Sequence, residues 1–243
     1  MSEYLERLMP RAPGLCVLVD PERTAPEAAA ALAIEVERAG VAALLIGTSY
    51  DGVARTGDVA AAIRRASGLP LLLFPGSAAQ LVPNVDAVLL LSLVSGRNAQ
   101  YLIEEHVRAV PFLKRHPVPT ISTAYILVDG GRVTAVEAVS QTRPLPWDSP
   151  EIVAAHAVAG RLIGMEALYL DAGSGAARPV PPAVVAAVRE AVPPPVPLFV
   201  GGGMRTPEQL CAARRAGADF LVVGSAVEAG GAGAVRELVA ALR

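Results

Sequence analysis

The stretch Pro197-Leu198-Phe199-Val200-Gly201-Gly202-Gly203-Met204-Arg205-Thr206 joins a short apolar run to three glycines and ends before a proline. The apolar run has the length and composition of a strand that is buried on both faces. Proline at a first helical position favours a helix over Thr206–Ala216. The stretch therefore predicts one strand–turn–helix unit. A second stretch, Pro70–Ser77, resembles it and favours a barrel of two similar halves.

The same alternation runs along the whole chain. We predict strands at Leu15–Val19, Ala42–Ile46, Leu71–Phe74, Ala87–Leu91, Thr120–Val128, Ala167–Leu170, Leu198–Val200 and Phe220–Val223. Segments of helical length lie between them, at Pro26–Ala39, Asp58–Ser67, Ala99–Lys114, Pro150–Leu162, Pro181–Ala191 and Thr206–Ala216. Eight such units in 243 residues predict an α/β fold, a (β/α)8 TIM barrel that forms a single domain over residues 1–243.

Two spacings depart from this rhythm. Only 16 positions separate the strand starts Leu71 and Ala87, which leaves too little chain for a full helix. The barrel is therefore predicted to be modified, with its third helix missing or irregular. In contrast, 47 positions separate Thr120 from Ala167, so Asp129–Ser149 is expected to form a large loop on the catalytic face.

Composition excludes several classes of protein. Hydrophobic residues make up 53% of the chain, but no run approaches the roughly 18 apolar residues of a membrane span, so none is expected. The net charge of -2 gives no footprint for nucleic acid, and no secretory segment opens the chain, so a cytoplasmic location is expected. The single lysine and three scattered histidines argue against Schiff-base and histidine–metal chemistry. Cys16 and Cys211 are expected to be ordinary buried thiols.

Polar residues follow several predicted strands, where TIM barrels place their chemistry. Asp20 follows the first strand and could hold Mg²⁺. Asp171 follows the sixth, beside glycine-rich turns whose backbone N–H groups can bind phosphate. Asp20 could instead form a turn and Asp171 a cap, and Asp129 before two glycines is equally compatible with a simple turn. The turns are Gly173-Ser174-Gly175, Gly201-Gly202-Gly203 and Gly224-Ser225.

At these motifs the sequence resembles the geranylgeranylglyceryl phosphate synthase family, which includes the bacterial heptaprenylglyceryl phosphate synthases. The stretch Tyr169–Gly175 is specific to the resemblance. The other segments that carry it are Leu18–Arg23, Leu45–Ser49, Leu73–Ser77, Ser92–Asn98, Ala124–Gly131, Val200–Thr206 and Val223–Glu228. The resemblance implies a prenyltransferase that joins sn-glycerol 1-phosphate to a polyprenyl diphosphate, with geranylgeranyl diphosphate as the expected donor, and releases diphosphate.

The resemblance also implies a Mg²⁺ cofactor and the roles of individual residues. Asp20 and the hydroxyl of Ser49 would bind the metal, with Thr48 as the alternative, and Asp20 and Asp171 would be the catalytic residues. The family usually has Glu where Asp171 stands and Lys where Arg23 stands. The implied substrate-binding residues are Tyr169, Leu170, Asp171, Ala172, Gly173, Ser174, Gly175, Gly202, Gly203, Gly224 and Ser225.

Two other functions remain open at this point. A phosphosugar isomerase of the histidine-biosynthesis type would use Asp20 and Asp129 as its two aspartates. A non-catalytic barrel that binds a phosphometabolite would have lost catalysis through the change at Asp171. A homo-oligomer is expected. Val184-Val185 and Leu238-Val239 form apolar helix faces that could bury against another subunit or belong to ordinary barrel packing. Transient contact with a membrane surface is also expected.

Overall fold

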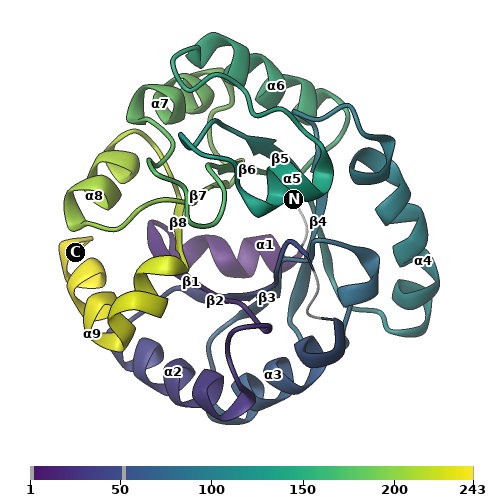
Figure 1. Ribbon diagram of the computed structural model, residues 1–243, viewed down its shortest axis with the longest axis vertical. Coiled ribbons are helices and arrows are strands. Elements are labelled where there is room, and N and C mark those ends of the chain that lie inside the picture. The colour runs from purple at the N-terminus through teal and green to yellow at the C-terminus, as the bar shows by residue number, and fades with distance from the viewer. Residues whose placement is uncertain (1–2, 51–52, 243) are drawn as a thin grey trace.

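A closed barrel of eight parallel strands forms the centre of the molecule (Figure 1), and the computed structural model describes residues 3–50 and 53–242. Residues 1–2, 51–52 and 243 of the predicted domain lie outside the described part. Each strand pairs with the next, and β8 pairs with β1. The strands are β1 (Gly14–Val19), β2 (Ala43–Ile46), β3 (Leu71–Leu73), β4 (Ala87–Leu93), β5 (Thr120–Leu127), β6 (Ala167–Asp171), β7 (Leu198–Gly201) and β8 (Phe220–Val223). The predicted TIM barrel is confirmed.

An outer ring of helices covers the barrel, as Figure 1 shows. These are α2 (Pro26–Ala39), α3 (Val53–Ala66), α4 (Glu105–Arg115), α6 (Pro150–Leu162), α7 (Pro182–Ala191), α8 (Pro207–Arg215) and α9 (Ser225–Ala241). Every residue from 74 to 86 is described, and that connection holds only a 3₁₀ turn, Ala78–Gln80. The predicted absence of a regular third helix is therefore confirmed. A π-helical turn, Gln100–Glu104, leads into α4.

Side chains alternate between two cores because successive residues of a strand point to opposite faces. In β6, Leu168 and Leu170 pack outward against the helices. Ala167 and Tyr169 pack inward with Phe199 and Phe220. The inward residues fill the barrel, so its lower part is a packed core. Thr123 is a buried polar residue in this part, and its hydroxyl donates to the carbonyl oxygen of Ile121 at 2.9 Å.

A short helix that the sequence analysis did not predict, α1 (Glu3–Leu8), lies behind the ring of strands in Figure 1. Leu5 and Leu8 are fully buried and belong to the same cluster as Cys16, Leu45 and Leu72 from the barrel interior. The helix therefore closes the end of the barrel opposite the mouth.

This packing predicts a large effect of a single truncation. Replacing Leu5 by Ala should lower the free energy of unfolding by about 2–5 kcal/mol, because the barrel interior cannot collapse onto the space left behind. Denaturant unfolding followed by circular dichroism measures it, with Glu6→Ala on the exposed face of α1 as the control. A loss for Leu5→Ala no greater than that of the control would contradict the packing of α1 against the barrel.

Several boundaries differ from the prediction. Strand β4 continues to Leu93, so Ser92 lies within the strand, and Asp171 is the last residue of β6. The predicted loop over Asp129–Ser149 contains a helix, α5 (Ala135–Ser140), in front of the strands in Figure 1. Of the two interpretations of Val184-Val185 and Leu238-Val239, ordinary barrel packing is confirmed, because all four side chains are buried between helices and barrel. Within residues 3–50 and 53–242, no helix is both long and apolar enough to cross a membrane.

Candidate functional site

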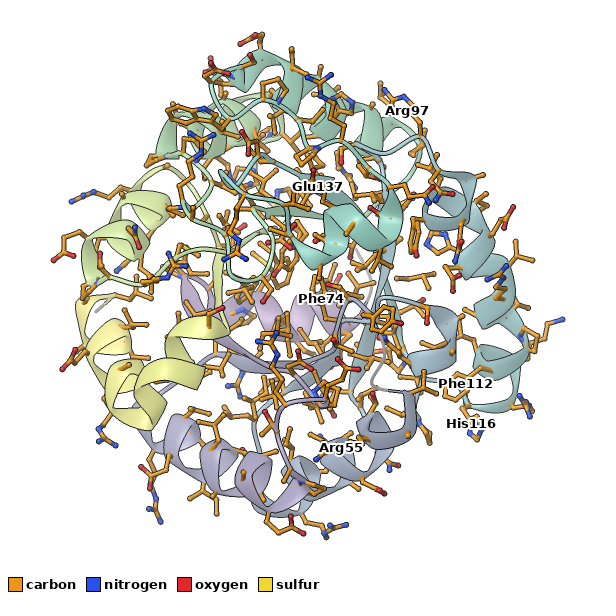
Figure 2. The ribbon with its side chains drawn as sticks, viewed as in Figure 1. Arg55, Phe74, Arg97, Phe112, His116 and Glu137 are labelled. Carbon is orange, nitrogen blue, oxygen red and sulfur yellow. The ribbon has the colours of Figure 1, made fainter. Side chains whose placement is uncertain are left out.

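A cavity of about 580 Å³ opens at the carboxyl ends of the strands. Phe74, which follows β3, lies near the centre of the barrel in Figure 2, whereas Phe112 on α4 and His116 directly after it lie at the outer edge. Phe74 stacks on Tyr169 at 4.8 Å between ring centroids, and both residues line the cavity. One part of the cavity wall is apolar, with Leu81, Leu90 and Leu93 among its residues. The remaining wall carries the polar groups described below.

The carboxylate of Asp171 lies in this cavity and is held on both oxygens. Its Oδ1 accepts a hydrogen bond from the backbone N–H of Gly173 at 2.8 Å. Its Oδ2 accepts a hydrogen bond from the hydroxyl of Tyr125. The strand register explains this contact, because Tyr125 on β5 pairs with Tyr169, two residues before Asp171 on β6. The two hydrogen bonds leave each oxygen a lone pair for a third group.

Burial raises the pKa of Asp171 above the 3.8 of a free aspartate, and the hydrogen bonds from Tyr125 and Gly173 oppose part of that rise. A raised pKa suits a carboxylate that accepts a proton near neutral pH. Burial together with the nearby Asp171 charge raises the pKa values of Tyr125 and Tyr169 well above 10, so both remain neutral hydroxyls. Asp171 and Tyr125 therefore combine a proton acceptor with a neutral hydroxyl that orients it.

Glycine loops after β6 and β7 pack directly against each other beside this carboxylate. Gly202 has φ +77°, and a Cβ there would lie 2.5 Å from Asp171 Oδ1 and 2.7 Å from the backbone of Gly173. Gly203 has φ +74°, and its Cβ would lie 2.8 Å from the carbonyl oxygen of Arg178. Both positions require glycine for space and for conformation. Ser174, Gly175, Gly202 and Gly203 all line the cavity, so backbone groups of both loops border it.

A helix N-terminus completes this side of the cavity. Gly224 precedes the first residue of α9, Ser225, and both line the cavity. Helix α9 is broken at Gly231 (φ +58°), so only its first short piece points at the cavity. The free N–H groups at the start of that piece favour an anion. Arg205 adds positive charge, and its guanidinium donates a hydrogen bond to the carbonyl oxygen of Ala176 at 2.7 Å. The arrangement can bind a phosphate group.

Asp20 and the predicted metal loop lie at the ends of β1 and β2. The two strands pair Val19 with Ile46, so Asp20 and Gly47 come one step beyond the last pair. Asp20 Oδ1 accepts from the N–H of Glu22 at 2.9 Å, and Oδ2 lies 3.7 Å from Arg23 Nε. Asp20, Thr48 and Ser49 all line the cavity.

These donors fit Mg²⁺, which is bound by one or two carboxylates together with waters and substrate phosphate oxygens. Asp20 supplies a carboxylate, and Ser49 and Thr48 supply hydroxyl oxygens at the end of the adjacent strand. No group of three or more His, Cys, Asp or Glu residues suited to a metal occurs in the described part of the chain. A cation held here would therefore take further ligands from substrate or water.

The segment between β5 and α6 covers part of the mouth and is anchored by Arg178. The guanidinium of Arg178 pairs with Asp129 at 2.7 Å and lies 4.1 Å from the centre of the Trp147 ring. Thr134, the residue before α5, packs its side chain against Gly173, where a Cβ would lie 2.6 Å from Thr134 Oγ1. Asp129 thus has a structural partner and is not among the described residues that line the cavity. This geometry gives no support to the isomerase alternative, which needs Asp129 beside the substrate.

Most predicted site residues lie together around the cavity, and three do not border it. The side chains of Leu170 and Ala172 pack in the layer between barrel and helices, because they alternate with the inward-facing Tyr169 and Asp171. Gly173 lies under Thr134 and orients Asp171. These three positions can contribute backbone groups only.

Tyr125 and His106 are among the site residues that were not predicted. Tyr125 lies within an apolar run, and its contact with Asp171 depends on strand register, which periodicity does not reveal. His106 on α4 lines the cavity, and its Nε2 lies 2.7 Å from the carbonyl oxygen of Leu91. From the sequence alone, His106 is only one of three scattered histidines without metal-site spacing.

Comparison with known proteins adds independent findings. A family model described as the PcrB family matches residues 11–242. Geranylgeranylglyceryl phosphate synthase from Spirosoma linguale is 45% identical over 212 residues, which cover 87% of this chain and 84% of the relative. The enzyme of the same name from Thermococcus kodakarensis is 38% identical over 95% of this chain and 90% of its own length.

The structural comparison agrees with these relatives. The crystal structure of (S)-3-O-geranylgeranylglyceryl phosphate synthase from Thermoplasma acidophilum, in complex with substrate sn-glycerol-1-phosphate, superposes with a TM-score of 0.91 at 29% identity. The match covers 99% of this chain and 98% of that one. Thiamine phosphate pyrophosphorylase from Pyrococcus furiosus matches with a TM-score of 0.60 at 15% identity and shares the fold alone.

Proposed function

Because the chain belongs to the PcrB family, we propose that it is a geranylgeranylglyceryl phosphate synthase-type prenyltransferase. It transfers the prenyl group of a polyprenyl diphosphate to sn-glycerol 1-phosphate, forms an ether bond and releases diphosphate. Geranylgeranyl diphosphate is the proposed donor, after the names of the relatives. The carrying observation is that the buried Asp171 carboxylate and the glycine loops after β6 and β7 meet in one cavity.

The polar residues around Asp171 have a direct role in this proposal. The loops with Ser174 and Gly203, together with the N-terminus of α9, bind the phosphate of glycerol phosphate. This anchoring holds a glycerol hydroxyl near Asp171. Tyr125 donates its hydrogen bond and keeps the carboxylate turned into the cavity. Asp171 then accepts the proton of that hydroxyl as the hydroxyl oxygen bonds to the prenyl carbon and diphosphate leaves that carbon.

The apolar wall and the metal residues serve the second substrate. Leu81, Leu90 and Leu93 give the prenyl chain an apolar surface. Asp20, with Ser49 or Thr48, would hold Mg²⁺ together with the diphosphate. When bound, the metal stabilises the negative charge of the leaving diphosphate. Burial of the prenyl chain away from water limits hydrolysis of the activated prenyl group.

The proposed metal role predicts the effect of losing one charge. Asp20→Asn should raise the Mg²⁺ concentration for half-maximal activity by roughly 10-fold or more, because a neutral amide is a much weaker ligand for a hard cation. The affinity for glycerol 1-phosphate should stay within a few-fold, since the phosphate loops lie on other strands. Titration of activity with Mg²⁺ measures the first and calorimetry the second. Wild-type activity that survives in EDTA would contradict the metal role.

The reaction itself is tested by diphosphate release. The wild-type protein is incubated with Mg²⁺ and a series of prenyl diphosphates of increasing length, each with and without sn-glycerol 1-phosphate. We expect release that requires both substrates and is fastest at one chain length. Release that does not depend on glycerol phosphate at any length would contradict the transferase.

The outer surface of α4 bears on assembly and location. The barrel leaves apolar side chains exposed along the outer face of α4 and its leading turn, including Ile103 and Val107 at 55% and 64%. Such a patch is typical of a surface that contacts another molecule. We propose a homo-oligomer, a cytoplasmic location and transient contact with a membrane surface, where prenyl substrates partition.

A further inference from the structure

The connection between β3 and β4 carries a buried polar side chain that the chemistry above does not use. Gln80 lies at the end of the 3₁₀ turn that replaces the third helix and is 1% exposed. Its Oε1 accepts a hydrogen bond from the N–H of Gly76 at 2.8 Å. Its Nε2 donates to the carbonyl oxygen of Thr48 at 3.2 Å. One amide group therefore joins this connection to the loop after β2.

The two segments that Gln80 joins are also in backbone contact. A Cβ on Gly76 would lie 2.6 Å from the carbonyl oxygen of Thr48 and 3.2 Å from the Cα of Ser49. A Cβ on Gly47 would lie 1.8 Å from the carbonyl oxygen of Phe74. Only glycine fits at either contact. The position of the Thr48–Ser49 segment is consequently set by the connection that holds Gln80.

Gln80 is itself fixed from the opposite side. Glu105 at the start of α4 accepts a hydrogen bond from the N–H of Ala78 at 2.7 Å, in the same 3₁₀ turn as Gln80. The carboxylate of Glu105 also accepts from Arg108 at 3.0 Å. The turn that carries Gln80 is therefore anchored to α4 through Glu105. From this turn the side chain of Gln80 reaches the loop after β2.

We propose that Gln80 is a positioning residue for the divalent cation. Its amide holds the Thr48–Ser49 segment so that the hydroxyl oxygen supplied there and the Asp20 carboxylate can bind one cation together. This inference rests on the metal part of the proposed function. Residues that orient metal ligands without touching the metal have large effects on affinity, because the ligands must be held before the metal arrives.

The test uses Mn²⁺ as the probe, since it takes the same oxygen ligands as Mg²⁺. Binding of Mn²⁺ in the presence of inorganic diphosphate is followed by electron paramagnetic resonance, which needs no turnover. Gln80→Met keeps the side-chain length but leaves Gly76 and Thr48 without this partner. We expect a Kd for Mn²⁺ about 10–100-fold weaker than that of the wild type. Saturating Mg²⁺ should restore most of the lost activity.

Two further variants make the result specific. Gln80→Asn keeps an amide that is too short to span both partners, and it should also weaken Mn²⁺ binding. It serves as the second variant if Gln80→Met does not fold by circular dichroism. Gln209→Met is the matched control, because Gln209 also clamps backbone N–H groups, those of Arg205 and Thr206, but on the phosphate side of the mouth. Its Mn²⁺ affinity should equal that of the wild type.

Each outcome decides between the inferences. Folded Gln80 variants with wild-type Mn²⁺ affinity overturn the role of Gln80 and leave the proposed reaction intact. An equal loss in Gln209→Met overturns it too, because the effect would then be general loosening. A wild type that binds no Mn²⁺ with diphosphate overturns both this role and the metal part of the function. A wild type that binds Mn²⁺ but transfers no prenyl group overturns only the proposed reaction.

Discussion

Asp171→Asn is expected to lower kcat by roughly 10²–10⁴-fold, the contribution of a well-placed general base. The substitution keeps the shape of the side chain, and the remaining oxygen can still accept from Gly173. Tyr125 can turn its hydroxyl to accept from the new amide. The change therefore removes the proton acceptor with little disturbance of the loops, and calorimetry should show an affinity for glycerol 1-phosphate within a few-fold of the wild type.

The same carboxylate predicts the direction of a pH effect. Burial raises the pKa of Asp171 above 3.8, so kcat/KM should fall as the pH drops through this raised pKa. The stability effect follows from the same shift. The folded state holds this proton more tightly than the unfolded chain does, so the contribution of Asp171 to stability is present below pH 3.8 and is lost as the pH rises through the folded pKa.

Asp129→Asn provides the matched control for these measurements. It neutralises an aspartate at the same end of the barrel whose partner is Arg178 and which does not border the cavity. We expect its kcat to stay within a few-fold of the wild type. Turnover of Asp171→Asn within threefold of the wild type would refute the role of Asp171 as base.

Gly202→Ala is expected to abolish most activity by a different route. The new methyl group would overlap Asp171 Oδ1 at 2.5 Å and the Gly173 backbone at 2.7 Å, so the carboxylate and the phosphate loop must both move. Positive φ adds about 1–2 kcal/mol of backbone strain. A displacement of this kind can cost on the order of 100-fold in rate. Steady-state kinetics should show a higher KM for glycerol 1-phosphate together with a lower kcat.

Gly164→Ala separates strain from displacement. Gly164 has φ +97°, and a Cβ there would meet nothing within 4 Å. The variant carries the backbone strain without touching the site, so it should lose stability and keep its kinetic constants. If Gly202→Ala lost no more activity than Gly164→Ala, the close packing of the two glycine loops would have no catalytic importance.

The sequence predicts the barrel well because its strands are buried on both faces. A strand between core and helices, such as β2 or β8, must be apolar at every position, and such runs stand out from the helical periodicity around them. The short helices α1 and α5 escaped prediction because six residues give too little periodicity to recognise. Their formation depends on packing against the barrel, which local sequence does not encode.

The candidate site also contains residues that the sequence predicts and residues that it does not. Asp20, Asp171 and the glycine turns were predictable, because polar residues and glycines are conspicuous at the ends of apolar strands. Tyr125 and Gln80 were not, because each acts through a partner distant in sequence: Tyr125 meets Asp171 46 positions away, and Gln80 meets Thr48 32 positions away. Leu170 and Ala172 were included by their place in a motif, but strand alternation turns their side chains away from the cavity.

The mass of the reaction product tests the central claim most directly. Purified protein is incubated with Mg²⁺, geranylgeranyl diphosphate and sn-glycerol 1-phosphate, and the lipid extract is analysed by mass spectrometry beside that of Asp171→Asn. We expect one new species with the mass of glycerol phosphate joined to one prenyl group through an ether, strongly depleted in the variant. The assignment would be contradicted if protein that binds glycerol 1-phosphate formed no such species with this donor or with a prenyl diphosphate of any other length.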